Sequence, residues 1–97
     1  MPEFIIFMHS DSATAETDTD WEAYIAMLHA SGKFCGGSSI GNGHAYRDGR
    51  LIGPAFTQIS GFIRVQAEDI AAARTLLEGN PTLQAGGTVE ILELVKS

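Results

Sequence analysis

Five apolar residues stand together near the start of the chain, at positions 4–8, in the order Phe-Ile-Ile-Phe-Met. A strand that is wet on one face alternates apolar and polar residues, and this run does not alternate. It therefore predicts a strand that is covered on both faces. The residues at 10–18 are small and polar and follow no period, which is typical of a loop.

The next segment has the apolar spacing of a helix. Thr19 and Glu22 have the form of a capping box, in which the hydroxyl accepts from the Glu22 N–H and the carboxylate reaches back. Gly32 is the predicted C-cap, and Lys33 suits the negative end of the helix dipole. The apolar stripe of this helix consists of Trp21, Tyr24, Ile25 and Leu28.

The second half of the chain repeats this plan. A strand predicted at 34–40 is followed by a glycine-rich segment at 41–58, which we expect to be a long loop with a hairpin turn at Asp48-Gly49. A strand at 61–67, a helix and a strand at 88–95 then follow. Asp69 is expected to cap this helix and Gly79 to end it, and its inner stripe holds Ile70, Ala73 and Leu77.

The resulting order of elements, β-α-β and again β-α-β, is that of a ferredoxin-like α+β fold in one domain over residues 1–97. Right-handed crossovers place the first and third strands in the centre of a four-stranded antiparallel sheet. Two helices cover only one face of such a sheet, whereas the first strand is predicted to be covered on both. A second copy of the chain would cover the other face, giving a homodimeric α+β barrel.

Composition and charge exclude several classes of protein. The chain has 97 residues, 44% of them apolar, which is the content of one small folded domain. Twelve acidic against six basic residues give a net charge of −6, which disfavours nucleic acids and anionic membranes as partners. The single cysteine, Cys35, excludes an intramolecular disulfide, and its thiol is expected to pack as a small apolar group. The apolar run at 4–8 is too short for a signal-peptide core, so a cytoplasmic location is expected.

Short motifs follow one another in a fixed order from about residue 20 onward. They are WEAY at 21–24, GKFCGG at 32–37, YRDG at 46–49, GPAF at 53–56, GF at 61–62, AEDI at 67–70, NP at 80–81 and GTVEI at 87–91. In order and spacing they resemble the YCII-related family, including its DGPF branch. The resemblance implies a small ferredoxin-like homodimer that forms an α+β barrel. Some relatives of this kind act on small, often aromatic, molecules, and a His–Asp pair has been suggested as their active site.

The sequence departs from the family pattern at both of those groups. By its spacing to Gly36-Gly37, the family histidine near the start of the first helix falls on Asp20. The acidic residue that opens the DGPF motif falls on Ile52, and Ala55 is inserted before Phe56. Asp20 is a candidate catalytic carboxylate through this alignment, while its place in the first helical turn is an alternative account of its charge.

Three histidines are spread along the chain. His9 closes the first strand and is a candidate general acid or base, with a hydrogen bond to backbone as the alternative. His29 lies at the edge of the helix stripe, where we expect its ring to pack and its tip to stay wet. His44 lies in the glycine-rich loop, where it would close over a ligand or be solvated. Their spacing is not that of a metal motif, and no metal or other cofactor is predicted.

The predicted strand at 61–67 carries a charged side chain on the face that the second copy is expected to cover. Phe62, Arg64 and Gln66 share the face that points between the two sheets of the barrel. A guanidinium there needs an anion or a paired acid. Arg64, with Gln66, would bind a substrate carboxylate or enolate, or Arg64 would form a structural ion pair with Glu3 or Glu90.

Two further patterns have simple interpretations. The glycine-rich stretch at 36–43 is no phosphate-binding loop, since Asn42 and not lysine follows Gly41 and no helix begins there. The carboxylates of Glu16, Asp18 and Asp20 suggest a cation site, but without EF-hand spacing they are interpreted as a solvated acidic loop.

Two functions follow from the sequence. The first is an enzyme on a small anionic or aromatic molecule, with His9 as acid or base, Arg64 holding an anionic group and residues 41–58 as a lid. The second is a non-catalytic dimeric module that binds a ligand or a partner. A fold of this type hosts many activities, so the substrate is not predicted.

Overall fold

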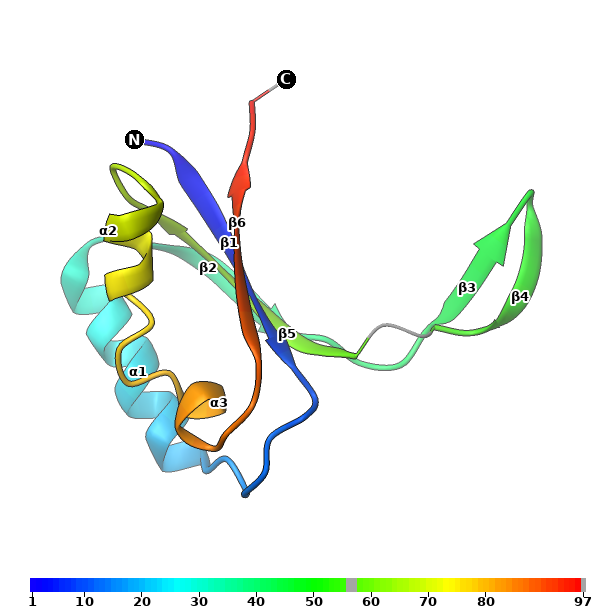
Figure 1. The fold of residues 1–97 in the computed structure, drawn as a ribbon, viewed down its shortest axis with the longest axis horizontal. Coiled ribbons are helices and arrows are strands. Elements are labelled where there is room, and N and C mark those ends of the chain that lie inside the picture. The colour runs from blue at the N-terminus through cyan, green and yellow to red at the C-terminus, as the bar shows by residue number, and fades with distance from the viewer. Residues whose placement is uncertain (56–57, 97) are drawn as a thin grey trace.

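A computed structural model describes residues 1–55 and 58–96, in which helices and strands follow the predicted order with an additional hairpin between the halves (Figure 1). Phe56 of the GPAF motif, Thr57 and Ser97 lie outside the described residues. The elements are β1 (Glu3–His9), α1 (Asp18–Ser31), β2 (Phe34–Ser39), β3 (His44–Arg47), β4 (Arg50–Pro54), β5 (Ile59–Gln66), α2 (Ile70–Thr75), α3 (Pro81–Gln84) and β6 (Val89–Leu94). No helix of this part of the chain is long and apolar enough to cross a membrane.

Four strands form one antiparallel sheet in the order β2-β5-β1-β6. The predicted central positions of β1 and β5 are thereby confirmed. Ile5 of β1 lies opposite Arg64 of β5 on one side and opposite Leu92 of β6 on the other. A register shift between Met8 and His9 ends the regular pairing with β5.

The helices pack on one face of this sheet and form the core with it. Along β1 the side chains alternate, with Phe4, Ile6 and Met8 buried and the residues between them half-buried. Tyr24 and Leu28 of α1 complete the core from the helix side. Burying an aliphatic or aromatic side chain of this size contributes about 1.5–3 kcal/mol to folding. In the part of the chain that the structure describes, the helices cover β1 on one face, and the side chains on its other face (the open face of the sheet) are half-buried, so the predicted cover on both faces is not met within one chain.

The first helix begins two residues earlier than the capping box predicted. Its N-cap is Thr17, whose hydroxyl accepts from the Asp20 N–H, so the prediction of Thr19 as the cap is wrong. The reason is a tertiary contact. The Glu16 carboxylate accepts hydrogen bonds from Trp21 Nε1 and Thr82 Oγ1, which fixes the chain just before Thr17. The predicted C-cap is confirmed, since Gly32 has a φ of 72° in the left-handed region.

The second half has its predicted N-cap but not its predicted C-cap. Helix α2 ends at Thr75 with Leu76 as its C-cap, and the chain continues to Gly79 in turns, so the prediction that Gly79 ends this helix is wrong. Asp69 caps α2 as predicted, and its carboxylate accepts from the Ala72 N–H. Ile70 was expected on the inner stripe, but it is 53% exposed, because α2 is only six residues long and packs through Ala73 and the turn after it. Helix α3 was not predicted, although Asn80 before Pro81 is a common helix start.

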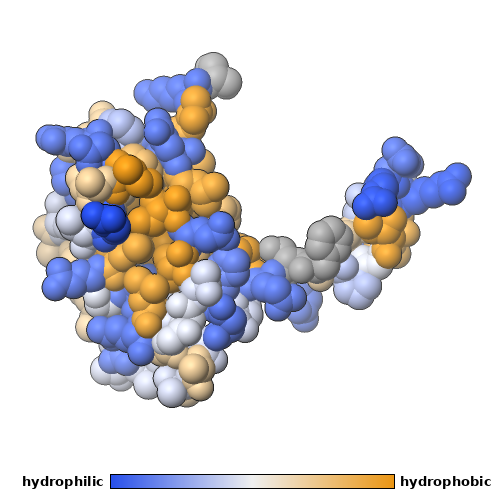
Figure 2. Space-filling view, viewed as in Figure 1, coloured by the Kyte–Doolittle hydropathy of each residue, from blue (hydrophilic) through white to orange (hydrophobic). Residues whose placement is uncertain are grey.

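The segment 41–58, expected to be a loop, contains the hairpin β3–β4. Its turn is at Asp48-Gly49 as predicted, with φ values of 52° and 73° that favour this residue pair. We call residues 44–54 the arm, because they stand away from the body of the molecule (Figure 1). The radius of gyration is 14.7 Å, whereas a compact chain of this length has about 12.5 Å. Figure 2 shows apolar side chains on the arm, and three large ones there are exposed: Tyr46, Leu51 and Ile52.

Candidate functional site

A cleft of about 620 Å³ opens between the N-terminal half of α1 and the neighbouring ends of β2 and β5. Its volume lies within the range typical of small-molecule sites. One face of α1 supplies Asp18, Trp21, Glu22 and Ile25. These positions are spaced by three or four residues, so their side chains follow one another along the same side of the helix.

The inner wall of the cleft is apolar and partly aromatic. Met8, Phe34 and Ile63 face the helix from three different strands, opposite Trp21 and Ile25. An edge-to-face contact with Tyr24, whose ring centroid is 5.9 Å away, holds the Trp21 ring from behind. This wall suits the face of a flat, ring-shaped molecule.

The polar groups of the cleft are hydroxyls and carboxylates. Ser38, Ser39 and Ser60 lie on the strand side, and the carboxylates of Glu16, Asp18 and Glu22 lie on the helix side. No lysine, arginine or histidine is among the described residues that line the cleft. A ligand that donates hydrogen bonds is therefore favoured over an anion.

Glu16 has a structural role that the sequence did not indicate. Its carboxylate accepts hydrogen bonds from Ser12 Oγ at 2.5 Å, Trp21 Nε1 at 2.9 Å and Thr82 Oγ1 at 3.1 Å. Burial alone would raise the pKa of Glu16, but these three hydrogen bonds outweigh it and lower the pKa from its usual value of 4.5. Glu16 is thus an ionised anchor for Trp21 and not part of a solvated acidic loop. Within residues 1–55 and 58–96, no group of acidic, histidine or cysteine side chains is arranged to hold a metal ion.

Asp18 and Glu22 are the carboxylates of the cleft that remain available. Neither makes a side-chain hydrogen bond or an ion pair with another of the described residues. They are four positions apart on α1, where two like charges repel each other by about 0.2–0.5 kcal/mol. A ligand that donates hydrogen bonds to both would relieve this repulsion.

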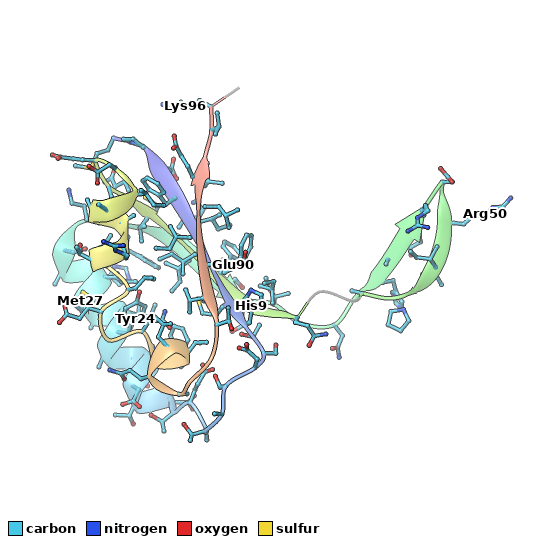
Figure 3. The ribbon with its side chains drawn as sticks, in the orientation of Figure 1. His9, Tyr24, Met27, Arg50, Glu90 and Lys96 are labelled. Carbon is cyan, nitrogen blue, oxygen red and sulfur yellow. The ribbon has the colours of Figure 1, made fainter. Side chains whose placement is uncertain are left out.

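The open face of the sheet carries the histidine predicted as an acid or base. His9 Nε2 lies 2.5 Å from Glu90 Oε1, joining β1 to β6 (Figure 3). Its partner is a carboxylate and not the backbone expected in the alternative interpretation. The pair is partly open to solvent, with His9 24% and Glu90 50% exposed in their side chains.

Arg64, the predicted anion-binding residue, also lies on the open face. Its Nη1 is 3.3 Å from Glu3 Oε1, and its Nη2 donates to the Cys35 carbonyl at 2.8 Å. Of the two carboxylates considered from the sequence, its partner is therefore Glu3. Gln66 lies next to it on the same face, where its Nε2 donates to the Gly32 carbonyl at 3.4 Å.

The residues predicted as a site are not gathered in one place. Arg64 is opposite Ile5 and His9 is opposite Ile59, which separates them by about 13 Å along β1. Asp20 is exposed in the first turn of α1 and does not line the cleft, and His44 is in the arm. The ring of His29 packs against Phe34 at a centroid distance of 4.6 Å, which confirms its expected boundary role.

Sequence reasoning missed the cleft, although one signal for it was present. Acidic and apolar residues alternate on one side of the first helix, at positions 18, 21, 22 and 25, which is unusual for a side that only packs or only faces water. The strand residues of the cleft could not be predicted, because their approach to the helix depends on the packing of the whole sheet.

Comparison with known proteins supports the fold. No protein-family model matches this chain, and no curated protein matches it by sequence. Among solved structures it is similar to 5-chloro-2-hydroxyhydroquinone dehydrochlorinase (TftG) from Burkholderia phenoliruptrix, in a complex with 2,5-dihydroxybenzoquinone. The TM-score is 0.58 at 16% sequence identity, and the match covers 98% of this chain and 95% of that chain. At this identity the likeness shows the α+β fold, and membership of the YCII-related family stays a prediction.

Proposed function

We propose that this protein is an enzyme that binds a small hydroxylated ring in the cleft beside α1 and acts on it by proton transfer. The observation that carries the proposal is the pairing of an aromatic wall, Trp21 and Phe34, with two available carboxylates, Asp18 and Glu22. The ring face would contact the wall, and ring hydroxyls would donate to the carboxylates. The name and complex of TftG, which concern molecules of the same class, support this choice of ligand.

Glu22 is the proposed general base. It takes the proton from a ring hydroxyl, the O–H bond breaks and its electron pair stays on the ring oxygen. A ring carbon made electron-rich in this way can be protonated by the same carboxyl group, which completes a proton shift and restores Glu22. The Ser38 and Ser60 hydroxyls donate to the backbone carbonyls of Ser39 and Met8, so the Ser39 hydroxyl, which also lines the cleft, is the proposed donor to a ring oxygen. The anchoring of Trp21 by Glu16 keeps the wall in place while this happens.

The dimer predicted from the sequence is part of this proposal. Two copies would pack their open sheet faces together, covering Ile5, Phe7 and Phe62. His9, Arg64 and Gln66 would then lie between the sheets, where the sequence placed a substrate site. Because Glu90 already holds His9 in a hydrogen bond and Glu3 already pairs with Arg64, we assign the substrate to the cleft and a structural role to these pairs.

Binding is tested with hydroquinone and hydroxyhydroquinone, which carry ring hydroxyls and are neutral near pH 7. Trp21 is the only tryptophan of the chain and lines the cleft, so its fluorescence reports occupation directly. We expect saturable quenching, weakened about tenfold or more by Glu22→Gln and by Asp18→Asn, since each removes a charged acceptor. Glu78→Gln is the matched control, because Glu78 is exposed and outside the cleft. Equal binding by all variants would contradict the assignment.

Catalysis is tested separately by exchange of ring hydrogens with deuterium in heavy water, followed by NMR. We expect exchange by the wild-type protein and a loss of about 10²–10⁴-fold in Glu22→Gln, the usual contribution of a general base. Saturable binding without exchange would instead support the non-catalytic binding module.

A further inference from the structure

Among residues 1–55 and 58–96, the strands of the arm pair with each other and with no other strand. These two strands form a separate sheet, and the arm stands away from the body (Figure 1). Tyr46 and Leu51 lie directly opposite each other in its register, so they share one face, and they are 67% and 58% exposed. A two-stranded hairpin with an uncovered apolar face is marginal in water. Such a face marks an interaction surface.

The charge of the arm is opposite to that of the cleft. Arg47 and Arg50 flank the turn, and Asp48 is the single acid of residues 44–54, which leaves the arm cationic in a chain of net charge −6. Arg50 lies at the far tip, away from the body (Figure 3). The cleft has three carboxylates and no cation among its described lining residues. Opposite fields of this kind favour and orient docking.

The direction of the arm excludes docking on its own cleft. In Figure 1 the helices lie to the left of the sheet, and the arm extends to the right of it. The cleft is lined by α1 and therefore opens on the helix side. A five-residue strand such as β4 spans about 16 Å, and two sheets packed face to face are about 10 Å apart. If a partner is packed on the open face, an arm of about 16 Å that runs alongside it is longer than the distance of about 10 Å between the two sheets. The end of the arm then reaches the helix layer of the partner, where the partner's cleft opens.

We propose that the arm of one copy docks across the mouth of the cleft in a second copy of this chain. Tyr46 and Leu51 cover the apolar wall from outside, and Arg50 lies beside Asp18 of the other copy. The cleft is then completed between two chains, and Glu22 is enclosed with the ring. The inference uses the face-to-face dimer of the proposed function for its geometry and does not depend on the chemistry assigned to the cleft.

The docking is tested by cross-linking between two differently tagged chains in which Cys35→Ala removes the native thiol. One chain carries Arg50→Cys in the arm and the other carries Asp18→Cys at the cleft. After mixing and treatment with a short bismaleimide, we expect a product that contains both tags. The matched control replaces Asp18→Cys by Glu78→Cys, an exposed position outside the cleft, and should give no such product. The pair Leu51→Cys and Ser39→Cys repeats the test at a second point should Asp18→Cys disturb the start of α1.

Two results would overturn the proposal: no mixed product with either pair, or equal yields with the Glu78→Cys control. A second readout is Tyr46→Ala, which should weaken hydroquinone binding about tenfold, as loss of a central aromatic contact does. The cross-link is measured without any ring compound. A mixed product together with no hydroquinone binding would uphold the docking and reject the proposed function, and hydroquinone binding without a mixed product would do the reverse.

Discussion

At position 37 of β2 the chain has no room for a side chain. A Cβ there would lie 2.5 Å from the Phe62 carbonyl oxygen and 3.1 Å from the Ile63 Cα, both backbone atoms of the neighbouring strand. Because backbone atoms of a paired strand cannot turn aside, Gly37→Ala is expected to lower the free energy of unfolding by about 1–3 kcal/mol. Urea unfolding at pH 7 measures this. Gly41→Ala is the control, since nothing lies within 4 Å of a Cβ there, and equal losses in both variants would contradict the account.

The Glu16 carboxylate makes the stability of the fold depend on pH. Its pKa is lower in the folded than in the unfolded state, so its contribution to stability is present above about pH 4.5 and is lost as the pH falls through the lowered value. Glu16→Gln is expected to cost about 1–2 kcal/mol at pH 7, because three donors lose a charged acceptor.

Comparison of wild type and Glu16→Gln by urea unfolding at pH 7 and at pH 3 tests the sign. The difference between the two proteins should shrink at the lower pH. A difference that stays constant would mean that the carboxylate acts by shape alone.

At the scale of elements, the start of α1 separates two threonines of equal intrinsic capping strength. The hydroxyl of Thr17 accepts from the Asp20 N–H, whereas Thr19 is already inside the helix and exposed. Thr17→Ala should therefore cost about 1 kcal/mol, and Thr19→Ala close to nothing. Thermal unfolding of both variants measures the difference, and a larger loss for Thr19→Ala would restore the capping box as the true start.

The elements show where sequence reasoning succeeds. Asp69 and Gly32 were predicted because a cap acts within four residues of its own position. Thr17 was missed because its selection depends on Glu16, which is held by Thr82 from the far half of the chain. The same distinction between local and long-range contacts explains the site. The face of α1 that lines the cleft can be predicted from residue spacing, whereas the position of β2 and β5 beside it depends on the assembled sheet.

At the scale of the whole molecule, the proposed dimer predicts a specific sensitivity of the open sheet face. Phe7 is half-buried there, on the side of β1 that the helices do not cover. Phe7→Glu should convert a species of twice 10.3 kDa into a monomer in analytical ultracentrifugation, because the interface would have to bury a charge. Met27→Glu is the matched change on the helix side, where Met27 is 39% exposed and points away from the sheet (Figure 3). A wild-type protein that sediments at 10.3 kDa would reject the dimer.

The order of strands in the sheet also has a consequence for synthesis on the ribosome. Strand β1 occupies the centre, and both of its neighbours, β5 and β6, follow it along the chain and are made later. Between His9 and Ile59, its nearest partner along the chain, lie on the order of 50 residues, or roughly 3–10 s of translation. During that interval the run at 4–8 has no strand to pair with. The native pairing of β1 therefore forms only after the second half of the chain has been made, and this apolar run stays without its partner strands until then.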